Sequence, residues 1–194
     1  ASTTANVTAK ALTATASAAN KTYNRNTTAN ITAKALTASA SASNKTYNGN
    51  TTATTTLTFS GLIGTETLGQ SVGSTFNNKN VGTGKTVTVN SITLANGSNG
   101  GLATNYSISA GQATTANITA KALTVSGITA SNKIYDGNTV ATLDTSSVNF
   151  GGLVSGDNFA ISVSGNFSDK NVANGKTITI TSSYSGSDTG NYSI

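Results

Sequence analysis

The sequence predicts an all-β protein in which small β-sandwich modules follow one another along the chain. One octapeptide, Asn-Ile-Thr-Ala-Lys-Ala-Leu-Thr, occupies residues 30–37 and 117–124, and residues 6–13 repeat it with Val7 in place of Ile. Between the copies, apolar residues often stand two apart, which is the period of a half-buried strand. Turn signals such as Asn-Gly and Asp-Gly separate these short runs, as they do in β-sandwich domains. A motif repeated in this way indicates a tandem array.

The composition suits β modules with thin cores and uncharged polar surfaces. Hydrophobic residues make up 36% of the 194 residues and charged residues 9%, against about 45–50% and about 25% in ordinary globular chains. The net charge of +5 is small for a chain kept disordered by charge. Thr is favoured in strands, and Asn and Gly are favoured in turns.

The residue types that carry most enzyme chemistry are missing. The chain has no Cys, His, Met or Trp, so it has no disulfide, no thiolate metal ligand and no imidazole base. No nucleophile–base pair is apparent, and we expect neither an enzyme nor a cofactor. The 11 Lys and Arg residues are spread singly, unlike the clustered basic face of a nucleic-acid-binding protein. No apolar run approaches the ~20 residues that cross a bilayer, so we expect no membrane insertion.

The spacing of the repeat sets the expected modules. A short interval separates Val7 from Ile31, and a much longer one separates Ile31 from Ile118. We therefore expect residues 1–10 to be the closing strand of a preceding module and residues 11–34 to be a truncated module. Residues 35–121 are expected to form a complete module, and residues 122–194 a module that lacks its final strand.

Strands are expected where apolar side chains alternate with Thr, Ser or Asn. Leu57 and Phe59 alternate in this way, and so do Val87 and Val89. The Gly-rich stretch 61–73 indicates a connection, and residues 96–101 indicate a loop. The expected strands are 36–41, 54–59, 74–76, 86–92, 105–109 and 113–121 in the complete module, and 123–125, 159–163 and 176–180 in the last one. The expected core of the complete module is Leu36, Tyr47, Leu57, Phe59, Leu62, Phe76, Val81, Val87, Val89, Ile92, Tyr106 and Ile108.

A short motif, Lys-x-Tyr-(Asn/Asp)-Gly, occurs once in each of these two modules. Asn-Gly and Asp-Gly favour a tight turn with positive φ, and the tyrosine is expected to anchor the core. Because Asn replaces Asp in one copy, the side chain is expected to bond its own turn rather than to act as an acid or a metal ligand. The aspartates are not spaced as a calcium loop requires, so we expect no metal site. The motif residues are Lys45, Tyr47, Asn48 and Gly49, and Lys133, Tyr135, Asp136 and Gly137.

Other chemistries stay open. Glu66 is the single Glu of the chain, and with Lys45 or Lys85 it would suit a Lys–Asn isopeptide bond, although no counterpart of Glu66 is apparent in the last module. Thr-x-Thr runs would order water on an ice-binding face, and they are equally typical of exposed strands. Asn-x-Ser/Thr sequons allow glycosylation and also arise by chance in such a chain.

With these motifs in place, the chain resembles the YDG repeats of large bacterial surface adhesins and the related mostly-β-grasp repeats. The first YDG element is matched by Lys133, Tyr135, Asp136, Gly137 and Thr139, the second by residues 169–176, and both modules contain Asn-Tyr-Ser-Ile. The resemblance implies repetitive extracellular proteins of the bacterial cell surface, akin to filamentous haemagglutinins. It also allows a β-grasp-like module in place of a sandwich. Asn48 departs from the pattern, as does Asn24-Arg25 in the truncated module.

The octapeptide is expected to be a joint: its first half closes one module and its second half opens the next. In a last module without a closing strand, residues 1–10 of another copy would complete the sheet. We favour instead a cut from a longer array, because the same motif also joins modules covalently inside the chain. We therefore expect a stalk or filament subunit of an extracellular bacterial adhesin or biofilm-matrix fibre, with neighbouring copies as partners. A carbohydrate-binding module for surface polysaccharide is the alternative. The expected joint or donor-strand residues are Asn6, Val7, Thr8, Ala9, Lys10, Asn117, Ile118, Thr119, Ala120 and Lys121.

Overall fold

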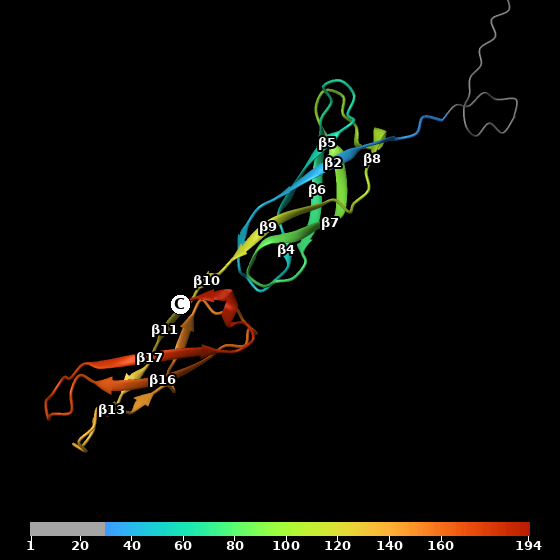
Figure 1. Cartoon of the computed structure of the whole chain (residues 1–194). Coiled ribbons are helices and arrows are strands. Elements are labelled where there is room, and N and C mark those ends of the chain that lie inside the picture. Colours follow the sequence, from blue (N-terminus) through green and yellow to red (C-terminus); the bar gives the residue numbers. More distant parts are fainter. Residues whose placement is uncertain (1–29) are drawn as a thin grey trace, which may run out of the picture. The chain divides into compact units, whose positions relative to one another are not determined.

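The computed structural model describes residues 30–194, several of whose strands are labelled in Figure 1, and Ala33–Ile194 belong to one unit. The predictions for residues 1–10 and for most of residues 11–34 lie outside the described residues. The described chain is all β, as expected, and its only helical elements are two 3₁₀ turns, η1 (Ala103–Asn105) and η2 (Thr189–Asn191). Among these residues, no helix is long and apolar enough to cross a membrane.

The first module comprises β1 to β9 and is built around a five-stranded sheet in the order β3-β9-β7-β6-β4. Its long strand β7 (Gly82–Asn96) pairs antiparallel with β6 (Leu68–Phe76) and with β9 (Ala113–Thr119). The edge strands are β3 (Lys45–Thr46) and β4 (Thr52–Ala53). β2 (Thr37–Ala42) and β5 (Thr55–Ser60) form an antiparallel pair, and β1 (Lys34–Ala35) pairs in parallel with β8 (Tyr106–Ser107).

The second module comprises β10 to β18 and repeats this plan with shorter strands. β16 (Ala160–Phe167), the counterpart of β6, pairs with β17 (Ile178–Ser185) and with β13 (Val140–Ala141). β17 corresponds to β7, and β13 corresponds to β4. β10 (Lys121–Ala122) pairs in parallel with β18 (Tyr192–Ser193), as β1 does with β8. The other pairs are β11 (Thr124–Ser126) with β15 (Asn149–Gly151) and β12 (Thr129–Ala130) with β14 (Leu143–Asp144).

The expectation that residues 61–73 form a connection is wrong for their second half, because Leu68 to Gly73 belong to β6. The glycines there permit close packing against β7. A Cβ on Gly73 would lie 2.5 Å from Ser91 Oγ, and a Cβ on Gly69 would lie 3.1 Å from Ala95 Cβ. Glycine within a strand often marks such an approach rather than a loop.

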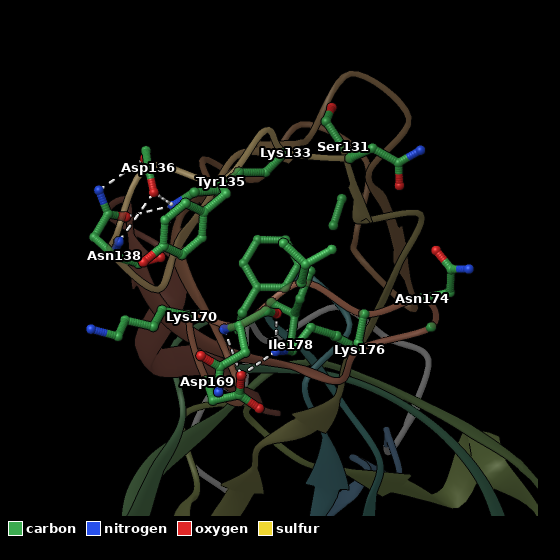
Figure 2. A pocket seen from close by; sticks show the side chains of 17 residues that line it. Ser131, Lys133, Tyr135, Asp136, Asn138, Asp169, Lys170, Asn174, Lys176 and Ile178 are labelled. Carbon is green, nitrogen blue, oxygen red and sulfur yellow. Dashed lines mark hydrogen bonds and ion pairs between the residues drawn. The ribbon is translucent and has the colours of Figure 1, made fainter.

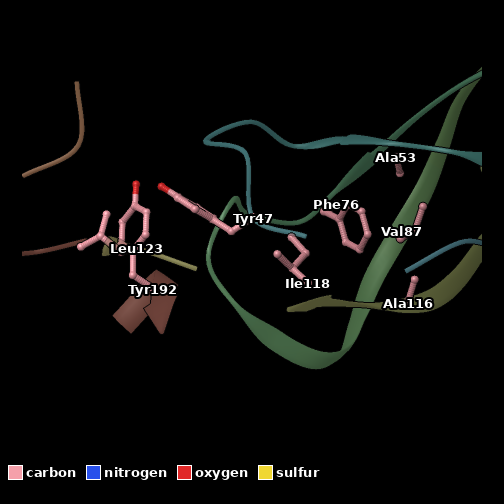
Figure 3. Close-up of a cluster of buried hydrophobic side chains, with 8 residues drawn as sticks. All are labelled: Tyr47, Ala53, Phe76, Val87, Ala116, Ile118, Leu123 and Tyr192. Carbon is pink, nitrogen blue, oxygen red and sulfur yellow. The ribbon is translucent and has the colours of Figure 1, made fainter. Parts of the chain in front are cut away.

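The core of the first module largely follows the predicted alternation. Seven of the expected residues are buried: Leu36, Tyr47, Leu57, Phe76, Val87, Val89 and Tyr106. The others, Phe59, Leu62, Val81, Ile92 and Ile108, are half-buried. One buried cluster runs from Ala53 and Val87 through Ile118 and Tyr47 to Leu123 and Tyr192 (Figure 3). Because its last two members belong to the second module, the cluster crosses from one module into the next.

Candidate functional site: the joint between the modules

One run of chain serves both modules at their joint. In the first module, β9 lies between β3 and β7, so that Ile118 is in register with Lys45 on one side and with Gly82 on the other. Only Ala120 separates β9 from β10, which belongs to the second module. The amide of Leu123 then donates to Ser193 O at 2.8 Å. The two modules are therefore joined by a segment that is hydrogen-bonded on both sides of the crossing.

Polar groups set the register of β9. The Asn117 amide donates to Asn44 Oδ1 at 2.7 Å, and Asn117 Oδ1 accepts the Gly84 amide at 2.8 Å. The Tyr47 amide donates to Thr119 O at 2.8 Å. Of the expected joint residues, Ile118 is buried, Asn117, Ala120 and Lys121 are half-buried, and Thr119 is exposed. Asn6, Val7, Thr8, Ala9 and Lys10 lie outside the described residues.

The polar centre of the joint is the carboxylate of Asp157, whose side chain is only 3% exposed. Tyr47 from the first module donates its hydroxyl to Asp157 Oδ2 at 2.8 Å, and Tyr192 donates to the same oxygen. Lys79 Nζ, also from the first module, lies 3.0 Å from Asp157 Oδ1. A buried carboxylate needs such partners, because leaving it without them would be strongly unfavourable.

Lys79 connects two carboxylates of the second module. Its Nζ lies 3.0 Å from Asp157 Oδ1 and 3.0 Å from Asp188 Oδ1. The same ammonium lies 5.8 Å from the centre of the Tyr47 ring. The hydrogen bonds that Lys79 donates to Asp188 and Asp157 raise its pKa, so this lysine stays charged.

The pKa shifts follow from these contacts. Burial alone would raise the pKa of Asp157, but the hydrogen bonds from Tyr192, Tyr47 and Lys79 outweigh it and hold that pKa below its ordinary value. Burial, together with the hydrogen bond to Asp157, raises the pKa of Tyr192 to about 12. The same two causes raise the pKa of Tyr47. Near neutral pH the site therefore holds two carboxylates, those of Asp157 and Asp188, together with one ammonium and two neutral phenols.

Apolar contacts surround this polar centre. The rings of Tyr47 and Tyr192 meet edge to face, with centroids 5.5 Å apart (Figure 3). Gly49, at φ +80°, lies so close to Val154 that an added Cβ would come within 2.7 Å of its Cγ1. The turn of the first module therefore needs glycine both for its backbone conformation and for the approach of the second module.

A buried asparagine adds a further bond across the joint. Asn191, from the second module, is 3% exposed, and its Oδ1 accepts the Val81 amide at 2.9 Å. Its Nδ2 lies 3.4 Å from Asn80 Oδ1. The Asn-Tyr-Ser-Ile element thus contributes both Asn191 and Tyr192 to the joint.

The Lys-x-Tyr-(Asn/Asp)-Gly motifs form turns held by their own side chains. Asn48 Oδ1 and Asp136 Oδ1 accept the amides two residues on, those of Asn50 and Asn138, and Gly49 and Gly137 both have φ +80°. Lys45 Nζ donates to Asn50 O at 2.7 Å, and Lys133 Nζ donates to Asn138 O at 3.1 Å (Figure 2). In both modules the lysine therefore closes the turn.

The expectation that both motif tyrosines anchor the core is wrong for Tyr135. Tyr47 is 1% exposed, whereas Tyr135 is 59% exposed. The physical reason is the joint: Asp157 and Tyr192 of the second module cover Tyr47, and no described residues cover Tyr135 in the same way. The buried state of this tyrosine depends on a neighbouring module.

Glu66 does have a counterpart in the last module, contrary to expectation, and it is Asp157. Tyr106 donates to Glu66 Oε2 and accepts the Ile63 amide, just as Tyr192 donates to Asp157 and accepts the Val154 amide. The sequence contains the signal: Gly-Leu at 61–62 and at 152–153 stands at the same distance before the two carboxylates. Sequence reasoning missed Asp157 and Lys79, which lie in loops, and Asn191, which ends η2, because each has partners in the other module.

The arrangement does not place Glu66 for isopeptide chemistry. Glu66 accepts from Tyr106, whereas Lys45 Nζ binds Asn48 Oδ1 at 2.9 Å and Lys85 Nζ binds Asn78 Oδ1 at 2.6 Å. Within residues 30–194, no group of three or more Asp, Glu, His or Cys side chains could hold a metal ion. The polar groups at the joint bind one another. Their hydrogen bonds and ion pairs hold the two modules together.

Comparison with known proteins identifies the repeat. The family model described as the YDG domain matches residues 32–116 and again residues 119–194. No curated protein and no solved structure matches the chain. The boundary between the two matches falls at the end of β9, within the joint.

Proposed function

Because the chain belongs to the YDG domain family, with two copies in tandem, we propose that it is a structural repeat of an extracellular bacterial adhesin or biofilm-matrix fibre. In this role each module adds length, and each joint fixes the direction of the next module. The stability of such an array is approximately a sum of module and interface terms. The family context supports the location at the bacterial cell surface, and the joint supports the mechanical role.

The observation that carries the proposal is the sharing of Asp157 between modules. Its carboxylate takes hydrogen bonds from Tyr47 and Lys79 of one module and from Tyr192 of the other. If the modules swung apart, the Asp157 carboxylate would lose its hydrogen bonds from Tyr47 and Lys79, and Lys79 would lose both of its carboxylate partners. Truncating one partner of a buried charge typically costs about 3–5 kcal/mol. We therefore expect the joint to hold the two modules in one geometry rather than to allow a range of hinge angles.

The path of the chain supports the same role. β9 completes the sheet of the first module and continues into β10 after a single residue. A linker that is paired with both modules leaves few free backbone torsions, in contrast to Gly/Ser-rich linkers that behave as flexible coils. Pulling on the chain would load hydrogen-bonded strands at the joint.

Lengthening the chain tests the mechanical role. Variants of the full chain in which residues 35–121 are duplicated once, twice and three times should increase in maximum dimension by equal steps, as measured by small-angle X-ray scattering. A flexible array would grow with roughly the square root of the number of modules, and that outcome would refute the proposal. Immunogold labelling of the producing bacterium with antibodies to the chain should mark fibres at the cell surface.

The carbohydrate-binding alternative stays a prediction from sequence. The second module has a groove between residues 130–138 and residues 167–178 in which a sugar could bind. In the first module, β9 occupies the corresponding place between β3 and β7. That correspondence favours a strand as its ligand. A glycan array probed with the full chain would reveal consistent sugar binding if the alternative held.

A further inference from the structure

One Asn-Gly pair in the first module lies in surroundings that favour a reaction of its own. The chain contains four such pairs, which begin at Asn48, Asn96, Asn99 and Asn174. In an Asn-Gly pair the backbone nitrogen of glycine can attack the side-chain carbonyl carbon of asparagine, because glycine has no side chain to hinder the approach. The attack closes a five-membered ring between neighbouring residues, so the reacting groups are already held close together.

The side-chain oxygen of Asn48 is held by two hydrogen-bond donors. Lys45 Nζ donates to Asn48 Oδ1 at 2.9 Å, and the Asn50 amide donates to the same oxygen at 3.3 Å. Negative charge develops on this oxygen when the carbonyl carbon is attacked, and an ammonium together with an amide stabilises such a charge. Because the Asn50 amide is two residues on, its hydrogen bond also places the side chain alongside the intervening Gly49 nitrogen.

The attacking group and the leaving group of this pair are not tied down by other contacts. Within residues 30–194, neither the Gly49 amide nor Asn48 Nδ2 makes a hydrogen bond. Asn48 is also exposed, so water reaches the site. The Gly49 amide can therefore lose its proton to water, and ammonia can leave from the side chain.

Two of the other pairs have one of these groups engaged. The Gly97 amide, which would attack Asn96, donates to Gly101 O at 2.9 Å. In the next pair the leaving nitrogen, Asn99 Nδ2, donates to Thr65 O at 2.9 Å. Each of these hydrogen bonds must open before the ring can close, so both pairs should react slowly in the folded chain.

The second module shows that the turn accommodates a carboxylate at this position. Asp136 stands where the first module has Asn48, and its Oδ1 accepts the Asn138 amide at 3.1 Å and lies 2.8 Å from Lys133 Nζ (Figure 2). Its other oxygen, Oδ2, accepts Asn138 Nδ2 at 2.9 Å. Both carboxylate oxygens are therefore bonded within the turn.

The first module already holds the donor for a second carboxylate oxygen. Asn50 Oδ1 accepts from Lys45 Nζ and from the Thr52 amide, both at 3.0 Å. The same two bonds orient Asn138 in the second module, where Nδ2 then donates to the carboxylate. By this correspondence Asn50 Nδ2 is directed at Asn48, whose own Nδ2 is a donor and cannot accept. A carboxylate at residue 48 would supply the missing acceptor.

From these contacts we infer that Asn48 is a self-modification site, which deamidates to aspartate and gives the first module the same Lys-x-Tyr-Asp-Gly turn as the second. Gly49 N forms a bond to Asn48 Cγ, the proton of its amide passes to water, and the bond from Cγ to Nδ2 breaks as ammonia leaves. Water then adds to Cγ of the cyclic imide, and the bond from Cγ to Gly49 N breaks. The net change is the consumption of one water and the release of one ammonia, and it does not depend on the proposed spacer role.

The same two donors direct the opening of the imide ring. Addition of water to Cγ gives aspartate, whereas addition to the backbone carbonyl carbon gives isoaspartate, which lengthens the backbone. Lys45 and the Asn50 amide polarise the Cγ carbonyl, so aspartate is the main product in the folded chain. Isoaspartate would alter the spacing of Tyr47 and Gly49, which both contact the second module.

Peptide mapping by mass spectrometry tests the inference on the full chain, incubated at mildly alkaline pH with and without concentrated urea. In urea all four pairs should convert at similar rates and give both aspartate and isoaspartate. In the folded chain Asn48 should convert fastest and mainly to aspartate. The internal reference is Asn174, which is exposed and receives no hydrogen bond from the described residues. Asn96 and Asn99 should convert roughly tenfold more slowly than in urea, because their hydrogen bonds must first open.

Two variants test the part played by the turn. Lys45→Met removes one donor and should slow the conversion of Asn48 by about tenfold, less than the ~10²–10³-fold effect of one donor in a closed active site, because Asn48 is exposed. Asp136→Asn creates the same Asn-Gly pair beside Lys133 in the second module, and it should convert there to aspartate at a rate similar to that of Asn48. Because Asp136 is exposed, this variant keeps the test valid if Lys45→Met fails to fold.

Three results would overturn the inference: conversion of Asn48 no faster than that of Asn174 in the folded chain, isoaspartate as its main product there, or no conversion in Asp136→Asn. An unchanged rate in folded Lys45→Met would equally remove the role of the lysine. Asn48→Asp, made directly, should unfold at a higher temperature than the freshly prepared parent chain. An equal or lower midpoint would show that the turn does not favour the carboxylate.

Discussion

Glu66 and Asp157 hold the same position in successive modules, and each accepts a hydrogen bond from the tyrosine of an Asn-Tyr-Ser-Ile element, Tyr106 or Tyr192. They differ in the hydrogen bonds and ion pairs that they receive from a preceding module. Asp157 also binds Tyr47 and Lys79, whereas the described contacts of Glu66 are with its own module. Asp157 therefore lies in a complete joint between two modules, whereas Glu66 shows only the contacts that its own module contributes to such a joint.

The two motif tyrosines should respond differently to loss of the hydroxyl. Tyr47→Phe removes a hydrogen bond to the buried Asp157 carboxylate and should lower the free energy of unfolding by about 1.5–3 kcal/mol. Tyr135→Phe changes an exposed side chain and should stay within about 0.5 kcal/mol. Urea denaturation of the two variants provides the comparison. Equal losses would mean that the tyrosines matter only within their own turns.

The two motif glycines offer a second matched pair. Gly49 and Gly137 share φ +80°, so alanine should strain both turns by a similar amount, on the order of 1 kcal/mol. At Gly49 the new Cβ would also meet Val154 at 2.7 Å, whereas at Gly137 it meets open space. Thermal unfolding should therefore show the lower midpoint for Gly49→Ala. A lower midpoint for Gly137→Ala would contradict the packing of the joint.

Ile118 should be the most sensitive apolar position in the joint segment. It is 1% exposed within the cluster that crosses the modules, so Ile118→Ala should cost about 2–5 kcal/mol through lost contacts and a cavity. Ile31→Ala, at the same place in the motif, is fully exposed and should leave the unfolding of a dilute sample unchanged. Hydrogen exchange should show lost protection in β3 and in the start of β7 for Ile118→Ala alone.

The joint should weaken at both extremes of pH. The pKa of Asp157 is lowered from an ordinary value of 3.8, so its contribution is present above that value and lost as pH falls through the lower folded pKa. The pKa of Tyr192 is raised from 10.0 to about 12, so its contribution is present below pH 10 and lost between 10 and about 12. Between the acid titration of Asp157 and the alkaline titration of Tyr192, the free energy of unfolding should change little with pH.

Tyrosinate absorbance checks the alkaline limit. The difference between the parent chain and Tyr192→Phe isolates one phenol, and its titration should have a midpoint near pH 12. A midpoint near the ordinary value of 10 would show that Tyr192 is not held by Asp157. Unfolding followed at the same pH values shows whether ionisation and loss of structure coincide.

The sequence predicted the parts of the fold that depend on local alternation. The strands around Leu57, Val87 and Val89 were found, because burial on one face of a strand leaves a period of two. β6 was missed in part because its glycines serve close packing against β7 rather than a loop. The polar centre of the joint was missed for another reason. Asp157, Lys79 and Tyr47 are far apart in sequence, and only the docking of two modules brings them together.

The central claim is that the joint holds neighbouring modules in one geometry, and a spin-label distance measurement tests it most directly. Labels at Thr58→Cys on β5 and Ser183→Cys on β17 occupy exposed positions in the two modules. We predict one narrow distance distribution, which broadens in Asp157→Ala and stays narrow in the exposed control Asp144→Ala. A broad distribution in the parent chain, or one that Asp157→Ala leaves unchanged, would contradict the claim.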